Sequence, residues 1–317
     1  MNIEIVVVGS YNQDLSWICD EFPKPGETIL GKFNMATGGK GSNQAVAASR
    51  TGIKTAFVGS VGNDSFGEAV KQFYANEGIE YFLTEQEGTP TGTAGIVVNN
   101  TGQNEIIVSP GANEKLSPAD IPENLIRDAQ VVICQFESKM DTTAHVLKIA
   151  RHANVTTILN PAPMRLDFNP GIIDNVDILI PNEIEFTSLL KSLRPELDEE
   201  FSEDTIHQLS EENLHQLCRN IGIDTIIVTL GNHGCFVSTT DDFKLLPASS
   251  HNKVVDSTGA GDAFVGAFAS GYVQFNKDIF ISATFGNLVA GLSVMKSGAA
   301  PSMPYKDEIT SFSPKHI

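Results

Sequence analysis

Basic residues are scarce in this sequence relative to acidic ones. The 317-residue chain carries 21 lysines and arginines against 39 aspartates and glutamates, which gives a formal net charge of −18 at pH 7. Because nucleic-acid binding needs a basic face, this balance argues against a nucleic-acid partner. It does not exclude an anionic substrate, since a local site can be positive on an acidic protein.

Cysteines and long apolar runs are also few. Cys19, Cys134, Cys218 and Cys235 lie far apart and form no C-x-x-C pair, which favours reduced, mostly buried thiols. No segment reaches the roughly 18 apolar residues that suggest a membrane span. Residues 1–8 have neither the basic start nor the long apolar run of a signal peptide. We therefore predict a cytoplasmic protein with no membrane partner.

Apolar runs alternate with segments of helical spacing along most of the chain, and hydrophobic residues make up 41% of it. This alternation predicts an α/β fold, with a doubly wound, mainly parallel sheet and helices on both faces. The predicted strands are 3–9, 55–58, 131–134, 156–159, 178–180, 224–230 and 234–237, and the predicted helices include 142–152, 183–190 and 278–295. The acidic segment 195–217 is predicted to be a solvated loop and helix face, and we assign it no function.

An antiparallel element interrupts this alternation. The runs 94–98 and 105–108 flank Asn99-Asn100-Thr101-Gly102, which is a hairpin signal. Together with a further strand-like stretch at 28–35, they predict a small β-sheet lid formed by roughly 11–39 and 92–110. We expect this lid to belong to a single domain that spans residues 1–317.

A glycine-rich turn near the C-terminus is the most informative motif. Gly259-Ala260-Gly261-Asp262 follows Asp256-Ser257-Thr258 and a β-branched pair, 254–255, and opens the apolar run 263–272, which predicts strand, tight turn and helix. The backbone N–H groups of 259–261 stay unobstructed at a helix N-terminus, so the turn suits an anion such as phosphate. Asp262 is then either a base beside that anion or an ordinary helix-start residue.

A second glycine-rich stretch, Gly38-Gly39-Lys40-Gly41-Ser42-Asn43, also runs into a predicted helix. It is neither a Walker A loop nor a G-x-G-x-x-G motif. Its glycines permit close approach of a ligand to the backbone, while Lys40 adds a positive charge and Asn43 an amide. The alternative is a plain turn before a helix.

Further polar residues follow the predicted strands, at the sheet edge where open α/β folds bind their ligands. Asn12 and Asp14 follow the first strand, Glu137 follows 131–134, and Asn182 and Glu185 follow 178–180. Turn chemistry and a helix capping box are the competing interpretations.

The segments Gly38–Gln44 and 259–262, in this order and spacing, resemble the two signatures of the ribokinase (PfkB) family of sugar and nucleoside kinases. Further motifs extend the resemblance over nearly all 317 residues. It implies a transferase that phosphorylates D-ribose at O5 with ATP, giving D-ribose 5-phosphate. A 2-deoxyribose kinase or another PfkB-type sugar or nucleoside kinase is the alternative.

The resemblance also implies roles for individual residues. Asp262 would be the base, and the backbone of Gly259, Ala260 and Gly261 would form the anion hole. The sugar would contact Asn12, Gln13, Asp14, Gly39, Lys40, Gly41, Ser42, Asn43, Glu137 and Asp262. ATP with Mg²⁺ would contact Asn182, Glu185, Thr229, Leu230, Gly231, Asn232, His233, Gly234, Gly261 and Asn287.

A monovalent cation and a homodimer follow from the same resemblance. Potassium or caesium would bind at Asp256, Thr258, Ser293, Lys296, Gly298 and Ser302, mostly through carbonyl oxygens. Lys296 could contribute only its carbonyl group, and Asp256 could instead merely cap the turn. Family members pair their lids in a homodimer, so we expect one here.

Two other classes of function compete with this interpretation. A non-catalytic sensor on the same fold is expected to have lost the base, whereas Asp262 is present. A nicotinamide oxidoreductase is expected to carry G-x-G-x-x-G after the first strand and an acidic residue at the end of the second, and both are missing. The histidines form no metal-spaced cluster, so no zinc site is predicted.

Overall fold

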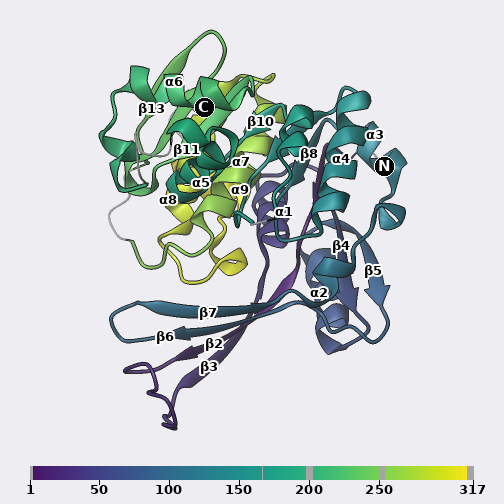
Figure 1. Cartoon of the computed structure of the whole chain (residues 1–317). Coiled ribbons are helices and arrows are strands. Elements are labelled where there is room, and N and C mark those ends of the chain that lie inside the picture. Colours follow the sequence, from purple (N-terminus) through teal and green to yellow (C-terminus); the bar gives the residue numbers. More distant parts are fainter. Residues whose placement is uncertain (1–2, 166, 198–202, 250–253, 313–317) are drawn as a thin grey trace.

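A large sheet covered by helices and a smaller separate sheet make up the computed structural model (Figure 1), which describes residues 3–165, 167–197, 203–249 and 254–312. The strands within these residues are β1 (Ile5–Val8), β2 (Asn12–Ile18), β3 (Lys32–Gly38), β4 (Thr55–Gly62), β5 (Glu80–Gln86), β6 (Thr93–Val98), β7 (Asn104–Ser109), β8 (Val131–Cys134), β9 (Thr156–Leu159), β10 (Ile178–Leu179), β11 (Thr225–Thr229), β12 (Cys235–Ser238) and β13 (Phe243–Leu246). The α-helices are α1 (Lys40–Arg50), α2 (Ser65–Asn76), α3 (Glu123–Asp128), α4 (Met140–His152), α5 (Glu183–Leu193), α6 (Glu211–Ile221), α7 (Ala260–Gln274), α8 (Ile279–Ser293) and α9 (Lys306–Phe312).

The large sheet runs in the order β13-β12-β11-β10-β9-β8-β1-β4-β5 within the described ranges. The pairs from β11 to β5 are parallel, and β12 and β13 are added antiparallel at one edge. Strand β1 reads Ile-Val-Val-Val and is buried on both faces, as expected for a parallel strand between two helix layers. Its side chains alternate between the two apolar cores, Ile5 and Val7 in one and Val6 and Val8 in the other.

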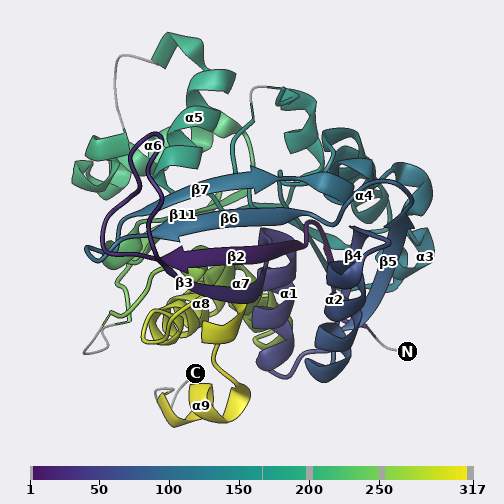
Figure 2. The same cartoon turned by 90° about the horizontal axis from the view of Figure 1, so that it is seen from below.

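Helices cover both faces of this sheet, as predicted. Apolar residues of α1, α2, α7, α8 and α9 form one core, and those of α3, α4, α5 and α6 form the other. Figure 2 shows the two groups on opposite sides of the sheet. The doubly wound α/β fold is thereby confirmed. No helix in the described ranges combines the length and apolar character that crossing a membrane requires.

The strand order reverses beside β1. From β1 the chain adds β4 and β5 on one side, and it later adds β8 to β11 on the other. Ligands of open α/β sheets bind at such a switch point, outside the carboxyl ends of the strands. Ser10 follows β1 and Gln135 follows β8 at this switch point. The carboxyl ends of these strands, called this edge below, are therefore the candidate site.

The small sheet has the order β3-β2-β6-β7 and projects from the body next to this edge (Figures 1 and 2). Its pairing places Asn12 and Asp14 on one face. The opposite face carries Leu15, Trp17, Phe33, Met35, Val97 and Ile107. The Asp14 face is polar near the large sheet and carries Ile18, Ile106 and Val108 farther out, whereas the opposite face is mainly apolar.

Several local predictions were wrong. Val254 and Val255 form no strand and are 68% and 52% exposed; no strand within the described residues pairs with them, and the Val255 N–H donates to the Val294 carbonyl. The stretch 28–35 becomes strand only from residue 32. Asn12 and Asp14 lie inside β2, so turn chemistry, the competing interpretation, does not apply to them. Strands β5 and β13 were not predicted.

The acidic segment contains more structure than expected. Residues 198–202 lie outside the described residues, but 211–221 form helix α6, whose N-cap Ser210 accepts a hydrogen bond from the Asn213 N–H. Leu214, Cys218 and Ile221 are buried on one face of α6, which explains why this polar stretch still forms a helix.

Candidate active site

The two glycine-rich motifs meet at the carboxylate of Asp262. Asp262 is the third residue of α7, and its side chain is only 7% exposed. Its Oδ2 accepts a hydrogen bond from Asn43 Nδ2 and its Oδ1 accepts one from Gln44 Nε2, both 2.9 Å long. Packing of α7 against α1 thus brings together residues more than 200 positions apart.

Charged side chains lie near the Asp262 carboxylate and influence its pKa. Burial raises the pKa of Asp262 above its usual value, while the Lys40 ammonium and the amides of Asn43 and Gln44 oppose the shift. Burial by itself would lower the pKa of Lys40, but the negative charges of Asp262, Glu137 and Glu185 outweigh it and raise that pKa. A buried carboxylate beside a retained positive charge can take up a proton next to a bound anion.

The N-terminus of α7 is open to a ligand. The N–H groups of Gly259 and Gly261 make no hydrogen bond within the described part of the chain, whereas the Ala260 N–H donates to the Ser257 carbonyl at 3.2 Å. No protein atom lies within 4 Å of the place a Cβ would occupy at Gly261. A hollow of about 180 Å³ covers this turn, and Lys40, Asn160, Asn182, Glu185 and Thr229 are among its lining residues. Free N–H groups at a helix N-terminus attract an anion into that space.

The start of α1 lies against the end of β1. Gly39 has a φ of 87°, and a Cβ there would approach the backbone nitrogen of Asn12 to 2.7 Å. The Lys40 N–H and the Ser10 hydroxyl both donate to Glu137 Oε2. Only glycine permits this close approach, which holds Glu137 beside the motif.

Asn12 and Asp14 face the same space from β2. Asn12 Oδ1 accepts a hydrogen bond from Asn113 Nδ2 at 2.9 Å. Burial, followed by the negative charges of Glu137 and Asp262, raises the pKa of Asp14 to about 7. The charges of Glu137 and Asp262 therefore act on the Asp14 carboxyl group, and three such acceptors near one another suit the hydroxyls of a polyol.

Two predicted sugar contacts have side chains that point elsewhere. Gln13 lies on the opposite face of β2 from Asp14, where its Nε2 donates to the Ala36 carbonyl and its Oε1 accepts from the Tyr11 hydroxyl. Ser42 is fully buried beside Tyr74, and only its backbone N–H reaches the site, at the Ser10 carbonyl. The alternation of β2 and the burial of one helix face account for both differences.

Asn182 and Glu185 form a capping box and also line the hollow over α7. Asn182 Oδ1 accepts from the Glu185 N–H, and Glu185 Oε2 accepts from the Asn182 N–H. Burial raises the pKa of Glu185, against the Asn182 hydrogen bond and the charge of Lys40. Asn182 and Glu185 therefore cap helix α5 and also line the hollow over α7, so both interpretations apply to them.

A second hollow, of about 400 Å³, adjoins the first, and the two share Ser257 and Ala260. It is mostly apolar, with Val254, Ala290 and Val294 in its lining, and Gly231, Asn232 and Asn287 contribute polar groups. Asn287 Nδ2 donates to the carbonyls of Leu246 and Pro247. An apolar slot that joins an anion-binding turn suits a flat aromatic base carrying phosphates.

Some residues of the run 229–234 line the two hollows, and the others pack against neighbouring parts of the protein. Thr229 lines the first hollow, and Gly231 and Asn232 line the second. Leu230 is buried, the ring of His233 stacks on His207 at 5.3 Å, and Gly234 packs against the Leu246 carbonyl. Leu230, His233 and Gly234 are absent from the lining of both hollows.

Asp256 connects the turn before α7 to the loop after α8. Its Oδ1 accepts from the Thr258 N–H at 2.9 Å and its Oδ2 accepts from the Gly298 N–H at 2.8 Å. Burial would raise its pKa, but these hydrogen bonds and one from Ser297 lower it overall. Lys296 Nζ pairs with Glu308 at 2.6 Å, and the hydroxyls of Ser293 and Ser302 donate to the Ala290 and Ala299 carbonyls.

Five polar residues at this edge were not singled out in the sequence: Ser10, Gln44, Asn113, Gln135 and Asn160. Gln135 and Asn160 directly follow β8 and β9, and Ser10 is the second residue after β1, so the strand-end rule could have identified them. Gln44 follows Asn43 in the motif. Asn113 carried no such signal.

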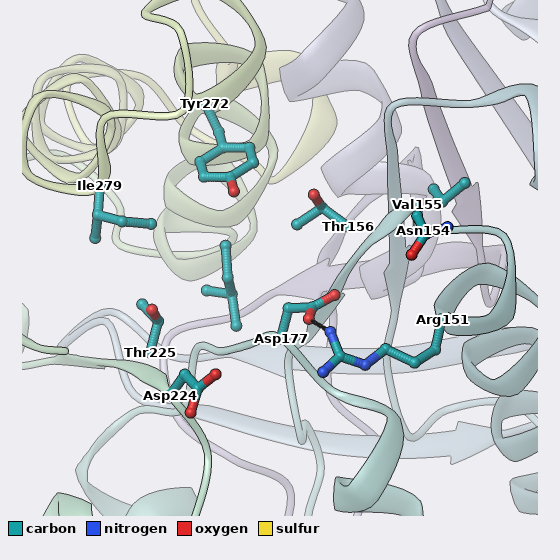
Figure 3. A pocket seen from close by; sticks show the side chains of 10 residues that line it. Arg151, Asn154, Val155, Thr156, Asp177, Asp224, Thr225, Tyr272 and Ile279 are labelled. Atoms are coloured by element: carbon teal, nitrogen blue, oxygen red, sulfur yellow. Dashed lines mark hydrogen bonds and ion pairs between the residues drawn. The ribbon is translucent and has the colours of Figure 1, made fainter. Parts of the chain in front are cut away.

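A different hollow, of about 560 Å³, lies at the amino ends of β9, β10 and β11 (Figure 3). Arg151 and Asp177 form an ion pair there, so the positive charge of the arginine is already balanced. Asp224 and the hydroxyl of Tyr272 also face this space. It lies at the opposite edge of the sheet from the glycine-rich motifs and contains none of the predicted site residues.

Known proteins resemble this chain in sequence and in overall fold. A family model described as pfkB family carbohydrate kinase matches residues 2–306. The chain is 35% identical to a ribokinase of Mus musculus, over 96% of this chain and 93% of that protein. A ribokinase of Dictyostelium discoideum is 35% identical, over 98% and 100%. A deoxyribokinase of Salmonella typhi is 31% identical, over 98% of each chain.

Solved structures agree with the sequence relatives. A ribokinase structure from Giardia lamblia matches with a TM-score of 0.87 and 30% identity, over 98% of this chain and 99% of that one. The structure of Arabidopsis thaliana ribokinase complexed with ribose and ATP matches with a TM-score of 0.86 and 30% identity, over 98% of each chain. With a matching fold, both motifs meeting at one buried carboxylate, and relatives along the whole chain, this protein belongs to the pfkB family of carbohydrate kinases.

Proposed function

We propose that this protein transfers the γ-phosphoryl group of ATP to O5 of D-ribose, giving D-ribose 5-phosphate. The observation that carries the proposal is the buried Asp262 carboxylate, which lies beside the free N–H groups at the start of α7. Polar groups of β2 and Glu137, which follows β8, lie near it, and Asp262 itself lines the first of the two adjoining hollows. The ribokinase relatives support ribose and ATP as the two substrates.

Asp262 is the general base in this proposal. It takes the proton from the ribose O5 hydroxyl as that oxygen attacks the γ-phosphorus, and the bond from that phosphorus to the bridging oxygen of ADP breaks. The N–H groups of Gly259 and Gly261 donate to the oxygens of the moving phosphoryl group. The Lys40 ammonium stabilises the same negative charge. Phosphoryl transfer depends mainly on such positioning and charge neutralisation.

The remaining sugar hydroxyls bind on the β2 side of the base. Asn12, Asp14, Asn43 and Glu137 offer amide and carboxylate groups there, and the backbone at Gly39 leaves room for the sugar. Burying these polar groups without a partner would be costly, so a sugar that satisfies them is strongly preferred.

The nucleotide occupies the adjoining hollows. Its phosphates lie over the turn at Gly261, near Asn182, Glu185 and Thr229, and its base enters the apolar slot beside Asn287. Asn182 and Glu185 present the amide and carboxylate oxygens that Mg²⁺ and its water shell prefer. Bound Mg²⁺ would neutralise charge on the β- and γ-phosphates.

A direct assay tests the reaction. The purified protein is incubated with ATP or with NAD and a panel of sugars, and both ADP release and the absorbance of reduced cofactor are followed. ADP release that requires both ATP and a pentose supports the proposal. Reduced cofactor with no ADP would instead indicate an oxidoreductase, and the absence of both signals would favour a sensor.

A 2-deoxyribose kinase is the second candidate, because a deoxyribokinase is among the relatives. Asn12 is 3% exposed and lies on the same face as Asp14, so it is placed to bind a secondary hydroxyl. A site built around a hydroxyl discriminates against the analogue that lacks it, since the buried partner is left unpaired. We expect a higher kcat/KM for ribose; a higher value for deoxyribose would select the alternative.

Potassium or another large monovalent cation is proposed beside the anion hole. Asp256 supplies a hard oxygen and already links Thr258 to Gly298, and the irregular loop 296–302 can present carbonyl groups. The Lys296 ammonium is directed to Glu308, which leaves only its carbonyl for a cation. A cation held there would add positive potential to the phosphate site. Rates measured with K⁺, Na⁺ and a bulky organic cation at fixed ionic strength test this; equal rates, with and without Asp256→Ala, would refute it.

A homodimer through the small sheet is also proposed, with that sheet acting as a lid over the sugar site. On the face away from Asp14, Trp17 is 40%, Phe33 49%, Met35 55% and Ile107 81% exposed. A contiguous apolar face on a thin sheet is stabilised by a partner, and a second copy of the same lid matches it in size and chemistry. Sedimentation at micromolar concentration should give a dimer. A cytoplasmic location remains a prediction.

A further inference from the structure

Gln44 is a fully buried residue next to the base, and it is absent from the lining of both substrate hollows. Its Nε2 donates to Asp262 Oδ1 at 2.9 Å and to Asn160 Oδ1 at 3.0 Å. Its Oε1 accepts from Gln135 Nε2 at 2.7 Å. Every polar atom of this side chain is therefore engaged with another buried polar side chain.

The direction of these hydrogen bonds is set by the neighbours of Gln44. An amide could turn its oxygen toward Asp262, which would repel the carboxylate, but the Gln135 donor faces Gln44 Oε1 and opposes that rotation. Gln135 is itself buried at the end of β8, with its Oε1 against Gly9 and Gly41. The chain of amides thus runs from β8 through α1 to the base on α7.

A second hydrogen bond, to Asn160, orients the other N–H of the Gln44 amide. Asn160, at the end of β9, accepts it and donates through its own Nδ2 to the Ile180 carbonyl at 2.8 Å. Residues from two strand ends therefore orient one amide on α1. Because Gln44 is held from both sides, it can keep Asp262 Oδ1 in place without contacting a substrate.

Asn43 differs from Gln44 in this respect. It holds the other carboxylate oxygen, Asp262 Oδ2, and it also belongs to the predicted sugar-binding set. Its Oδ1 is buried and has no hydrogen-bond partner within the described residues. Substitution of Asn43 would therefore disturb the predicted sugar contact as well as the base, whereas Gln44 lines neither hollow and holds the base without a predicted substrate contact.

We propose that Gln44 is the positioning residue of this kinase: held by Gln135 and Asn160, it aims the Asp262 carboxylate and keeps it ionised when the sugar binds. The inference rests on the proposed role of Asp262 as base. It assigns to the buried amide chain a function that concerns kcat and its pH dependence, not the affinity for either substrate.

Gln44→Met tests this, because methionine has a similar length and no donor. We expect kcat to fall on the order of 10- to 100-fold, as for loss of one hydrogen bond to a charged group. The KM values for ribose and ATP should stay within about twofold, since Gln44 touches neither. The acid limb of the kcat–pH profile should move to higher pH by about one unit, since a lost donor raises the pKa of a carboxyl group.

Two variants make the outcome decisive. Gln135→Met removes the donor to Gln44 Oε1 and leaves the Asn160 contact in place, so it should move kcat and the acid limb in the same direction by a smaller amount; it decides the question by itself if Gln44→Met does not fold. Val146→Ala, in the core on the other face of the sheet, controls for lost stability and should leave the pH profile unchanged.

Asp262→Asn separates failure of this inference from failure of the proposed function. If Asp262→Asn retains wild-type kcat, the base has been misassigned. If it is inactive while Gln44→Met and Gln135→Met keep the wild-type kcat and pH profile, the positioning role is refuted and the base role stands.

Discussion

Ribose binding should depend on pH through Asp14. The pKa of this carboxyl group is raised from 3.8 to about 7 by burial and by the negative charges of Glu137 and Asp262. Ribose hydroxyls need an ionised acceptor at this position, so below pH 7 a proton must leave before the sugar binds. The apparent Kd should therefore be about tenfold higher at pH 6 than at pH 8, which is the linkage expected for one proton.

The substitution Asp14→Asn removes this titration. The amide keeps an acceptor but loses the charge, so ribose should bind more weakly at pH 8, by about 1.5–3 kcal/mol. Its Kd should then be the same at pH 6 and pH 8. Isothermal titration calorimetry in buffers of different ionisation enthalpy measures both the affinity and the proton released.

In the ligand-free protein, the stability of the fold should change with pH in the direction opposite to the change in ribose affinity. Because the folded pKa of Asp14 lies above its unfolded value of 3.8, the folded state holds the proton more tightly. This group therefore stabilises the fold at low pH and loses that contribution as pH rises from about 4 through 7. Relative to Asp14→Asn, wild-type stability should fall between pH 5 and pH 8, by at most about 2.7 kcal/mol.

Two results would refute this reasoning. One is a wild-type Kd that changes less than twofold between pH 6 and pH 8. The other is a pH dependence that survives in Asp14→Asn, which would place the titrating group elsewhere. The other carboxyl groups whose charges act on Asp14 are Glu137 and Asp262. Asp262→Asn should keep a pH dependence, moved to lower pH because one of the charges that raise the Asp14 pKa is removed.

Three further substitutions probe the base, the motif turn and the lid. Asp262→Asn should lower kcat on the order of 10²–10⁴-fold with the fold intact; near-normal turnover with unchanged circular dichroism would remove it from the base role. Gly39→Ala should raise the ribose KM and destabilise the protein by about 1–3 kcal/mol, because a Cβ meets Asn12 at 2.7 Å. Gly78→Ala, which shares a positive φ but has no atom within 4 Å, should leave that KM unchanged. Ile107→Lys should shift sedimentation from dimer to monomer, since it places a charge on the apolar lid face; a dimer that persists would move the interface elsewhere.

The sequence alone determined the fold class and most of the chemistry. Buried runs such as Ile5–Val8 differ clearly from helical spacing, so the α/β alternation was readable without contacts. The turn at Gly261 and Asp262 could also be interpreted from the sequence alone, because free N–H groups at a helix start depend on only a few consecutive residues. The capping box of Asn182 and Glu185 is local in the same way.

Only the tertiary structure decided which polar groups share the site. The pleat of β2 turns Gln13 away from Asp14, and the missing neighbour strand leaves Val254 without the pairing its β-branched side chain favours. Packing of α7 on α1 is what brings Gln44 to Asp262, across 218 positions. Local propensity and spacing act over a few residues, whereas these contacts depend on sheet order and helix packing, which no short stretch of the chain specifies.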